Sequence, residues 1–119
     1  LIDLPATVLD IAGLDTSLVE DGRSIEVIDL RSISPLDVPT VAASVAKTGR
    51  LIIAHEAPTF GGMGGELAAA ITERCFYSLQ APVIRVGGYY MPYPVSRVEE
   101  EYVPDIDRIL EAVDRAFDY

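Results

Sequence analysis

The chain alternates short apolar runs with longer segments in which apolar residues recur every three or four positions. Residues 25–30, 51–54 and 83–86 are runs of strand length that are rich in Val and Ile, and they predict three strands. Strands that are separated by helices run parallel and have helices on both faces of their sheet. The pattern therefore predicts an α/β fold, a three-layer α/β/α sandwich around a mainly parallel sheet.

Three helices are predicted between and after these strands. Asp37 can accept a backbone hydrogen bond at the start of the first helix, which ends at Gly49. The second helix covers about residues 63–79, and the third begins near Asp105. The apolar residues at helical spacing that would pack on the sheet are Val38, Val41, Ala42, Val45, Leu67, Ile71, Cys75, Leu79, Ile106, Ile109, Leu110, Val113 and Phe117.

The first twenty residues fit this pattern less well. Asp3 can cap a helix that begins at Pro5 and breaks near Gly13, and residues 1–3 resemble the end of a further strand. Three strands are few for a parallel sheet with helices on both faces. We therefore expect a sheet whose amino-terminal strands are truncated.

Length and charge add the general class of the protein. A chain of 119 residues can bury a core as one domain, 1–119, with an atypical segment (1–22) followed by the α/β part (23–119). No apolar run approaches the ~20 residues that span a bilayer and there is no signal-peptide pattern, so we expect a cytoplasmic protein. The net charge of -10, from 19 acidic and 9 basic residues, argues against binding to nucleic acid or anionic membranes and leaves basic partners possible.

The segment HEAPTFGGMGGE, residues 55–66, joins a predicted strand to a predicted helix. Glycines allow close approach of the backbone, and the free N–H groups at a helix amino terminus attract anions, so the segment is a candidate ligand or regulatory site. However, the spacing of Gly61, Gly62, Gly64 and Gly65 matches neither a dinucleotide fingerprint nor a P-loop, and no lysine follows. The pattern favours the alternative that the glycines let the helix lie close to a strand or to another subunit.

His55 is the only histidine in the sequence and follows the second predicted strand, where α/β proteins often bind ligands. Glu56 beside it should point to the opposite face and is poorly placed to orient the imidazole. There is no second histidine and no Gly-x-Ser-x-Gly motif for a metal site or a hydrolase triad. We therefore predict no catalytic, cofactor-binding or metal-binding residues, and a His55 that is hydrogen-bonded within the loop. Cys75 is predicted to be a small buried residue rather than a reactive thiol.

Four segments of the sequence together resemble a known family. EVIDLRSISPLD, KTGRLIIAHEAPTFGGMGGELAAAI, APVIRVGGYYMPYP and VPDIDRILEAV occur in the order and at the spacing seen in one type of domain. They resemble the carboxyl-terminal transketolase-like domain of the β subunit of the first, decarboxylating component of 2-oxo acid dehydrogenase complexes. The resemblance covers about residues 21–119 and fits both pyruvate and branched-chain members.

The resemblance implies an assembly domain without catalysis of its own. In that family, thiamine diphosphate and its magnesium lie between the α subunit and the amino-terminal domain of the β subunit, so neither is expected in this chain. The carboxyl-terminal domain pairs subunits and offers a surface to the small basic subunit-binding domain of the acyltransferase. The acidic surface of this chain would attract such a module by charge complementarity.

The resemblance also points to residues that would meet the acyltransferase. Members often carry Asp just before the Ala-Pro that opens the last strand, where it pairs with an arginine of the basic domain. Here that position is Gln80, and a neutral amide cannot form the same charge-assisted pair. The acidic surface can instead come from Glu99, Glu100 and Glu101 or from the end of the last helix at Tyr119, although an acidic run can also be simply solvated.

The amino-terminal segment departs from the family. LIDLPATVLDIAGLDTSLVEDGRS resembles a sulfatase segment in which Asp-Leu-x-Pro-Thr-x-Leu-Asp-x-Ala-Gly precedes Asp-Gly-Arg-Ser, so a recombined or engineered chimera with no native activity is an alternative. In the family, a central strand lies between the strands that are here residues 25–30 and 51–54. Without that strand, both would expose unpaired backbone groups. We therefore expect a homo-oligomer, or exchange of segments with a second copy.

Overall fold

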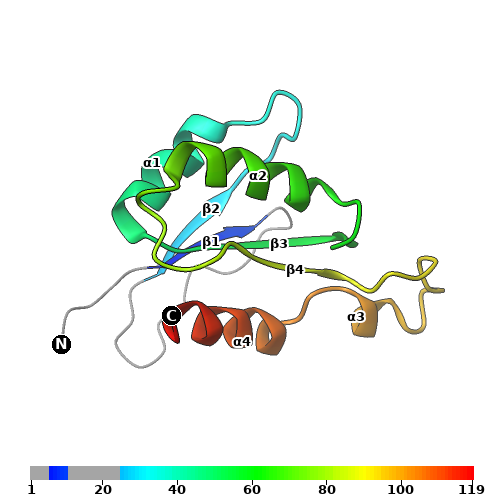
Figure 1. The fold of residues 1–119 in the computed structure, drawn as a ribbon. Coiled ribbons are helices and arrows are strands. Elements are labelled where there is room, and N and C mark those ends of the chain that lie inside the picture. Colours follow the sequence, from blue (N-terminus) through cyan, green and yellow to red (C-terminus); the bar gives the residue numbers. More distant parts are fainter. Residues whose placement is uncertain (1–5, 11–24) are drawn as a thin grey trace.

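The computed structural model describes residues 6–10, as backbone only, and residues 25–119. The described residues form a parallel sheet between two helical layers (Figure 1). The elements are β1 (Ala6–Asp10), β2 (Ile25–Asp29), α1 (Val38–Thr48), β3 (Leu51–Pro58), α2 (Met63–Cys75), β4 (Ile84–Gly88), α3 (Glu99–Tyr102) and α4 (Ile106–Phe117). Helices α1 and α2 cover one face of the sheet and α4 covers the other (Figure 1). The predicted three-layer α/β/α sandwich is confirmed.

β1 is the central strand that the sequence analysis considered missing. The strand order is β2-β1-β3-β4, and Val8 of β1 is level with Val27 on one side and Ile52 on the other. The prediction of a helix beginning at Pro5 is therefore wrong. Two β-branched residues, Thr7 and Val8, are stiff in a helix, and parallel pairing on both sides satisfies the strand backbone. These two effects outweigh the weak local cap signal.

The position of β1 also removes one argument about association. The prediction that β2 and β3 would expose unpaired facing edges is wrong, because β1 pairs with both of them. Unpaired edges on β2 and β3 therefore give no reason to expect a homo-oligomer or segment exchange. The predicted cap at Asp3, the strand end over residues 1–3 and the break near Gly13 lie outside the described residues.

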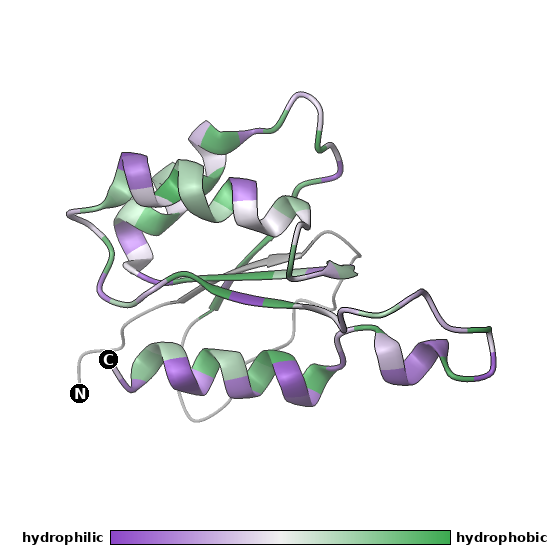
Figure 2. Cartoon of the chain, turned by 45° about the vertical axis from the view of Figure 1, so that its right-hand side comes forward, coloured by the Kyte–Doolittle hydropathy of each residue, from purple (hydrophilic) through white to green (hydrophobic). Residues whose placement is uncertain are grey.

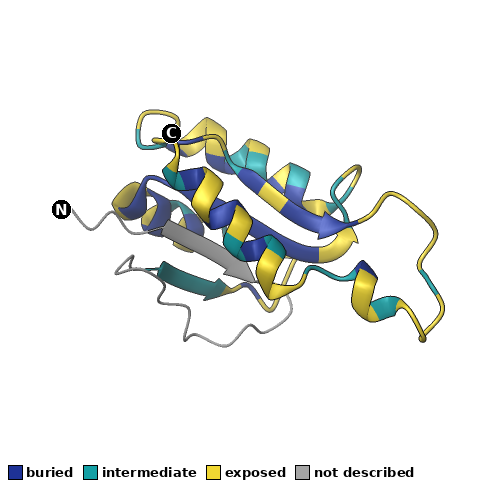
Figure 3. Ribbon diagram, turned by 90° about the horizontal axis from the view of Figure 1, so that it is seen from below, coloured by how far each residue is buried: buried dark blue, intermediate teal, exposed yellow. Residues whose placement is uncertain are grey.

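Each face of the sheet has its own apolar cluster. Alternation along β3 divides its side chains, so that Leu51 and Ile53 pack with α1 and α2, whereas Ile52 and Ala54 pack with α4. Figure 3 shows the buried residues along β3 and β4 and on the sides of the helices that face them, whereas β2 is only partly buried. On α4, the apolar residues form a stripe along the side that packs on the sheet, and polar residues occupy the rest of the helix surface (Figure 2).

Capping residues set the start of α1 and of α4, and the end of α1, at the predicted positions. The Asp37 side chain accepts a hydrogen bond from the Thr40 backbone N–H at 3.2 Å, and Gly49 ends α1 with a left-handed φ of 71°. Asp105 begins α4 by accepting a bond from the Arg108 backbone N–H at 2.8 Å. Helix α2 ends at Cys75 rather than near residue 79, because the next turn tightens onto the Cys75 carbonyl oxygen.

Two further expectations concern burial. Cys75 is buried, as predicted, and its Sγ lies 3.7 Å from the Ala42 carbonyl oxygen. Along residues 25–119, no helix has the length and apolar character that a membrane span requires.

Candidate functional site

His55 lies within β3 and faces helix α2. Its side chain is only 5% exposed, because it continues the inward-facing series that begins with Leu51 and Ile53. Glu56 follows on the opposite side of the strand and is exposed. The prediction that these two neighbours point apart is therefore confirmed.

The imidazole of His55 is buried. Among the described residues, neither Nδ1 nor Nε2 makes a hydrogen bond of normal geometry, whereas the Ala57 backbone acts on the ring as a weak hydrogen-bond partner, so the predicted hydrogen bond within the loop is only partly formed. Burial lowers the pKa of His55, the nearby Ala57 backbone acts in the opposite sense, and the positive charge of Arg85 lowers the pKa further. The ring is consequently neutral near pH 7.

The glycines around His55 leave just enough room for its ring. A Cβ on Gly64 would overlap Nε2 of His55, and a Cβ on Gly62 would lie 2.9 Å from Cε1 and would also overlap the Pro58 carbonyl oxygen. Gly87 of β4 closes the third side, since a Cβ there would lie 3.2 Å from Cε1. These three glycines therefore allow close packing around a histidine side chain. For Gly62 and Gly64 this agrees with the expected close approach of the helix to a strand, whereas Gly87 was not part of that expectation.

The two remaining glycines of the loop have different roles. Gly61 has a φ of 74°, a left-handed conformation that favours glycine, and a Cβ there would meet nothing within 4 Å. Gly65 lies against Arg85, whose Nη1 would be 3.3 Å from a Cβ at Gly65. Arg85 also donates a hydrogen bond from Nη1 to the Thr59 carbonyl oxygen at 2.9 Å, so it holds the loop against β4.

Exposed aromatic residues and one methionine gather after the carboxyl ends of β3 and β4, and apart from Phe60 of the 55–66 loop they were not predicted as a site. We call this group the aromatic surface; its members are Phe60, Tyr89, Tyr90, Met91 and Tyr93. Phe60 is 73% exposed and Tyr90 is 79% exposed, and their rings meet edge to face with centroids 5.0 Å apart. Phe60 follows β3 and Tyr90 follows β4, so the surface joins segments that are distant in sequence.

A buried tyrosine holds the aromatic surface in place. Tyr102 of α3 is 4% exposed, and its ring lies 5.0 Å from that of Tyr93 and 6.5 Å from that of Tyr89. Gly88 makes this possible, because a Cβ there would come within 2.6 Å of the Tyr102 ring. A pocket of about 210 Å³ opens between Tyr89, Met91 and Tyr102. The segment after β4 is therefore anchored to the fold, although most of its side chains face water.

Gln80 lies at the other end of the sheet and is engaged within the chain. Arg50, which is 5% exposed, donates from Nη1 to Gln80 Oε1 and from Nε to the Ala116 carbonyl oxygen, both at 2.8 Å. The Arg50 guanidinium also lies 4.8 Å from the centre of the Phe117 ring. Arg50 thus joins Gln80 to the end of α4, close to the exposed Tyr119.

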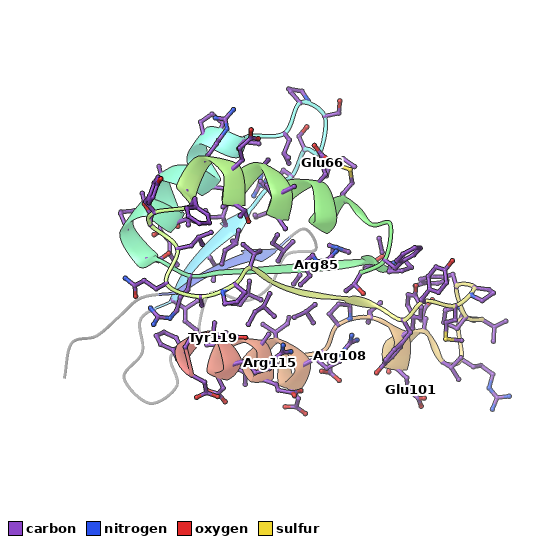
Figure 4. The ribbon with its side chains drawn as sticks, in the orientation of Figure 1. Glu66, Arg85, Glu101, Arg108, Arg115 and Tyr119 are labelled. Carbon is purple, nitrogen blue, oxygen red and sulfur yellow. The ribbon has the colours of Figure 1, made fainter. Side chains whose placement is uncertain are left out.

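The predicted partner-binding residues consequently form two separate groups. Gln80 and Tyr119 lie near the amino ends of β3 and β4, whereas Glu99, Glu100 and Glu101 lie in α3 beyond the carboxyl end of β4. Figure 4 shows Tyr119 and Glu101 at opposite ends of the molecule. The two groups therefore do not form one continuous surface.

The described part of the chain offers no cluster of three or more His, Cys, Asp or Glu side chains that could hold a metal ion. His55, the residue best suited to a metal by type, has its ring enclosed by three glycines.

Comparison with known proteins gives a consistent group of relatives. The model of the family "Transketolase, C-terminal domain" matches residues 5–109. The pyruvate dehydrogenase E1 component subunit beta of Leifsonia xyli is 54% identical over 100 residues, which are 84% of this chain and 30% of that protein. The 3-methyl-2-oxobutanoate dehydrogenase subunit beta of Mycobacterium tuberculosis is 47% identical over 105 residues, 88% of this chain and 30% of that protein.

A third relative is the mitochondrial 2-oxoisovalerate dehydrogenase subunit beta 2 of Arabidopsis thaliana, which is 46% identical over 113 residues, 95% of this chain and 31% of that protein. The chain thus spans about 30% of the length of these curated relatives. The family match begins at residue 5 and includes most of the segment that resembles sulfatases, so it does not support a sulfatase origin for that segment.

Proposed function

Because the chain belongs to the family of transketolase carboxyl-terminal domains, we propose that it is a subunit-interaction domain of a 2-oxo acid dehydrogenase β subunit. In this role it contributes to the thiamine-diphosphate-dependent first component and has no catalysis of its own. The names of the relatives support the proposal, since they are β subunits of 2-oxo acid dehydrogenases. The same names include pyruvate and branched-chain types, and the proposal covers both.

The aromatic surface is the observation that carries the proposed role. Exposed apolar side chains that gather in one place mark sites where another protein binds, and tyrosine is enriched among the residues that dominate binding energy. Phe60, Tyr90 and Tyr93 are each more than half exposed. The buried Tyr102 contacts the rings of Tyr89 and Tyr93, which positions the segment after β4, and Phe60 from the neighbouring loop contacts Tyr90. A surface that is already ordered loses little conformational entropy when a partner binds.

Thiamine diphosphate and magnesium would be held by other parts of the first component. The described residues do not fit a diphosphate at the most suitable position, the amino end of α2. There the His55 ring and the Pro58 carbonyl oxygen occupy the space beside Gly62 and Gly64. The space beside the Cα atoms of Gly62 and Gly64 is therefore filled by the chain itself.

The proposed partners are the α subunit, a second β subunit and the basic subunit-binding domain of the acyltransferase. For the basic domain, Gln80 is a poor docking point, because its amide is neutral and its Oε1 already accepts a hydrogen bond from Arg50. The acidic residues Glu99, Glu100 and Glu101 beside the aromatic surface are the better candidates.

Isothermal titration calorimetry tests this proposal directly. The chain should bind the purified α subunit or the purified basic domain saturably, and Tyr90→Ser should weaken that binding. Tyr77→Ser is the matched control, since Tyr77 is 99% exposed but lies outside the aromatic surface. If neither partner binds, or if thiamine diphosphate with Mg²⁺ raises the melting temperature of the chain alone, the proposal is wrong.

A further inference from the structure

Three of the nine basic residues of the chain line a single pocket. The pocket, of about 270 Å³, lies between α4 and β4, which is an edge strand of the described sheet. Its basic residues are Arg85, Arg108 and Arg115. Figure 4 shows Arg108 and Arg115 along α4, below the strand that carries Arg85. The pocket is therefore a basic site on a chain whose net charge is -10.

The described acidic residues do not neutralise these arginines. Among residues 25–119, ion pairs are formed by Arg31 and Lys47 but by none of the three arginines of the pocket. Glu111 is the only acidic residue among the described residues of the lining. With three positive charges and one negative charge, the lining has a net charge of +2.

Contacts within the fold hold two of the guanidinium groups in place. Arg108 donates a hydrogen bond to the Gly87 carbonyl oxygen and lies over the Tyr89 ring, 4.8 Å from the ring centre. Arg85 donates from Nη1 to the Thr59 carbonyl oxygen at 2.9 Å. These bonds use only part of the five N–H donors that each guanidinium carries. Two positive charges are thus fixed before a ligand binds, which lowers the entropic cost of binding.

Arg115 is the third cation of the pocket. It follows Arg108 by seven residues, so it lies two turns further along the same side of α4, at a distance of about 10 Å along the helix axis. Its side chain is exposed and makes no hydrogen bond or ion pair with the described residues. Positive charge is therefore available at both ends of a stretch of the pocket that is two helical turns long.

The wall between the arginines is apolar. Ile84 and Val86 of β4 line the pocket together with Ala112 of α4, and all three residues are buried. Pockets that bind small molecules typically combine such an apolar lining with a few polar groups that fix the orientation of the ligand. A ligand with a hydrocarbon part therefore suits this wall better than a bare phosphate ion does.

We propose that the pocket binds a small organic anion that carries two carboxylate groups. A guanidinium pairs with a carboxylate through two parallel N–H···O bonds, and arginines at both ends of the pocket suit a ligand with two such groups. The net charge of the chain does not prevent binding, because exposed charges more than about 8 Å away are largely screened at physiological salt. The inference goes beyond the interaction role proposed above and does not rest on it.

Titration of the intact chain with succinate, followed by NMR of the backbone amides, tests the inference. Succinate should bind saturably, and the shifted resonances should be concentrated in residues 84–88 and 108–115. Succinamide has the same carbon skeleton without the charges and should cause no saturable shift. Inorganic phosphate should bind several-fold more weakly than succinate, because it has no hydrocarbon part to cover the apolar wall.

Two substitutions of exposed residues should change the affinity for succinate in opposite directions. Arg115→Gln should weaken binding by about three- to tenfold, since it removes one charge-assisted pair. Glu111→Gln should strengthen binding by about two- to threefold, since it removes the negative charge of the lining. Arg74→Gln and Glu100→Gln are the matched controls: they make the same charge changes at exposed positions outside the pocket and should leave the affinity unaltered.

The substituted side chains are all exposed, so the variants should keep the circular dichroism spectrum of the parent chain. Three results would each overturn the inference: no saturable binding of succinate, equal affinity for succinate and phosphate, or equal effects of Arg115→Gln and Arg74→Gln. None of these results bears on the calorimetric test with the α subunit, so failure here and failure of the proposed function can be told apart.

Discussion

The His55 ring lies directly against the Cα of Gly64, with no room for a Cβ between them. The contact joins the middle layer to the outer layer of the fold, because His55 belongs to β3 and Gly64 to the first turn of α2. The His55 ring fills the space that a side chain at position 64 would need, so the residue at position 64 has to be glycine.

Gly64→Ala should destabilise the chain by roughly 1–3 kcal/mol, since the new methyl group would overlap the His55 ring in a packed interior. Chemical denaturation with urea measures the loss. Gly65→Ala is the control in the next position of α2. Its methyl group would lie 3.3 Å from Arg85 Nη1, so the gain of about 1 kcal/mol from helix propensity is offset by a small displacement of Arg85, and the net change should be much smaller than that of Gly64→Ala.

A double variant tests the cause of that loss. When His55→Ala removes the ring, Gly64→Ala should cost much less than it does beside the histidine, because the overlapping atoms are gone. An unchanged cost in the two backgrounds would contradict the contact described above.

Stability should depend on pH through His55. The folded-state pKa lies below the ordinary value of 6.5, so below that pH the unfolded chain takes up a proton that the folded chain does not bind. The free energy of unfolding should therefore fall as the pH drops from 7 toward 5, by at most about 1.4 kcal/mol per pH unit. Urea denaturation at several pH values measures this slope, and His55→Asn should reduce it. If the free energy of unfolding depended on pH equally in the parent chain and in the His55→Asn variant, His55 would not be the cause of the dependence.

Gln80→Glu should stabilise the chain by about 0.5–1 kcal/mol, because a carboxylate would accept a charge-assisted hydrogen bond from Arg50 in place of the present neutral one. Thermal unfolding at low and high salt measures the gain, which salt should reduce. Gln80→Met is the control that removes the acceptor, and it should lower stability. A glutamate variant that is less stable than the parent at low salt would show that the Arg50 contact does not hold Gln80.

Val8→Pro tests the assignment of β1 as the central strand. Proline removes a backbone N–H from a strand that pairs on both sides, so we expect a loss of roughly 3 kcal/mol or more in the free energy of unfolding. Val95→Pro is the matched control, since Val95 is 74% exposed and lies between β4 and α3, outside every element. Equal and small effects of both substitutions would contradict the central position of β1.

The regular elements that pack by their own periodicity could be predicted from the sequence. Val41 and Val45 of α1, like Leu67 and Ile71 of α2, recur at helical spacing and are fully or almost fully buried. The cap at Asp37 could be predicted because its signal is local. β1 could not be predicted in the same way, since the hydrogen bonds that make it a strand come from β2 and β3.

The candidate site was harder to predict for two different reasons. The role of the glycines depends on the His55 ring, and the sequence does not show that β3 and α2 meet at that point. The aromatic surface does have a signal in the sequence, although it is not periodic. Tyr89, Tyr90 and Tyr93 lie in a proline-containing segment, 89–94, that cannot form a helix or a central strand and so cannot bury them in a regular element. Clusters of aromatic residues in such segments are therefore candidates for interfaces.

Hydrogen exchange measured by mass spectrometry, on the chain alone and with the α subunit or the basic domain in saturating amount, tests the central claim most directly. If the aromatic surface is the docking site, at least one partner should slow exchange in residues 59–63 and 89–103, while the segment around Tyr77 exchanges at its original rate. Protection confined to the end that carries Gln80 and Tyr119, or no protection with either partner, would contradict the claim.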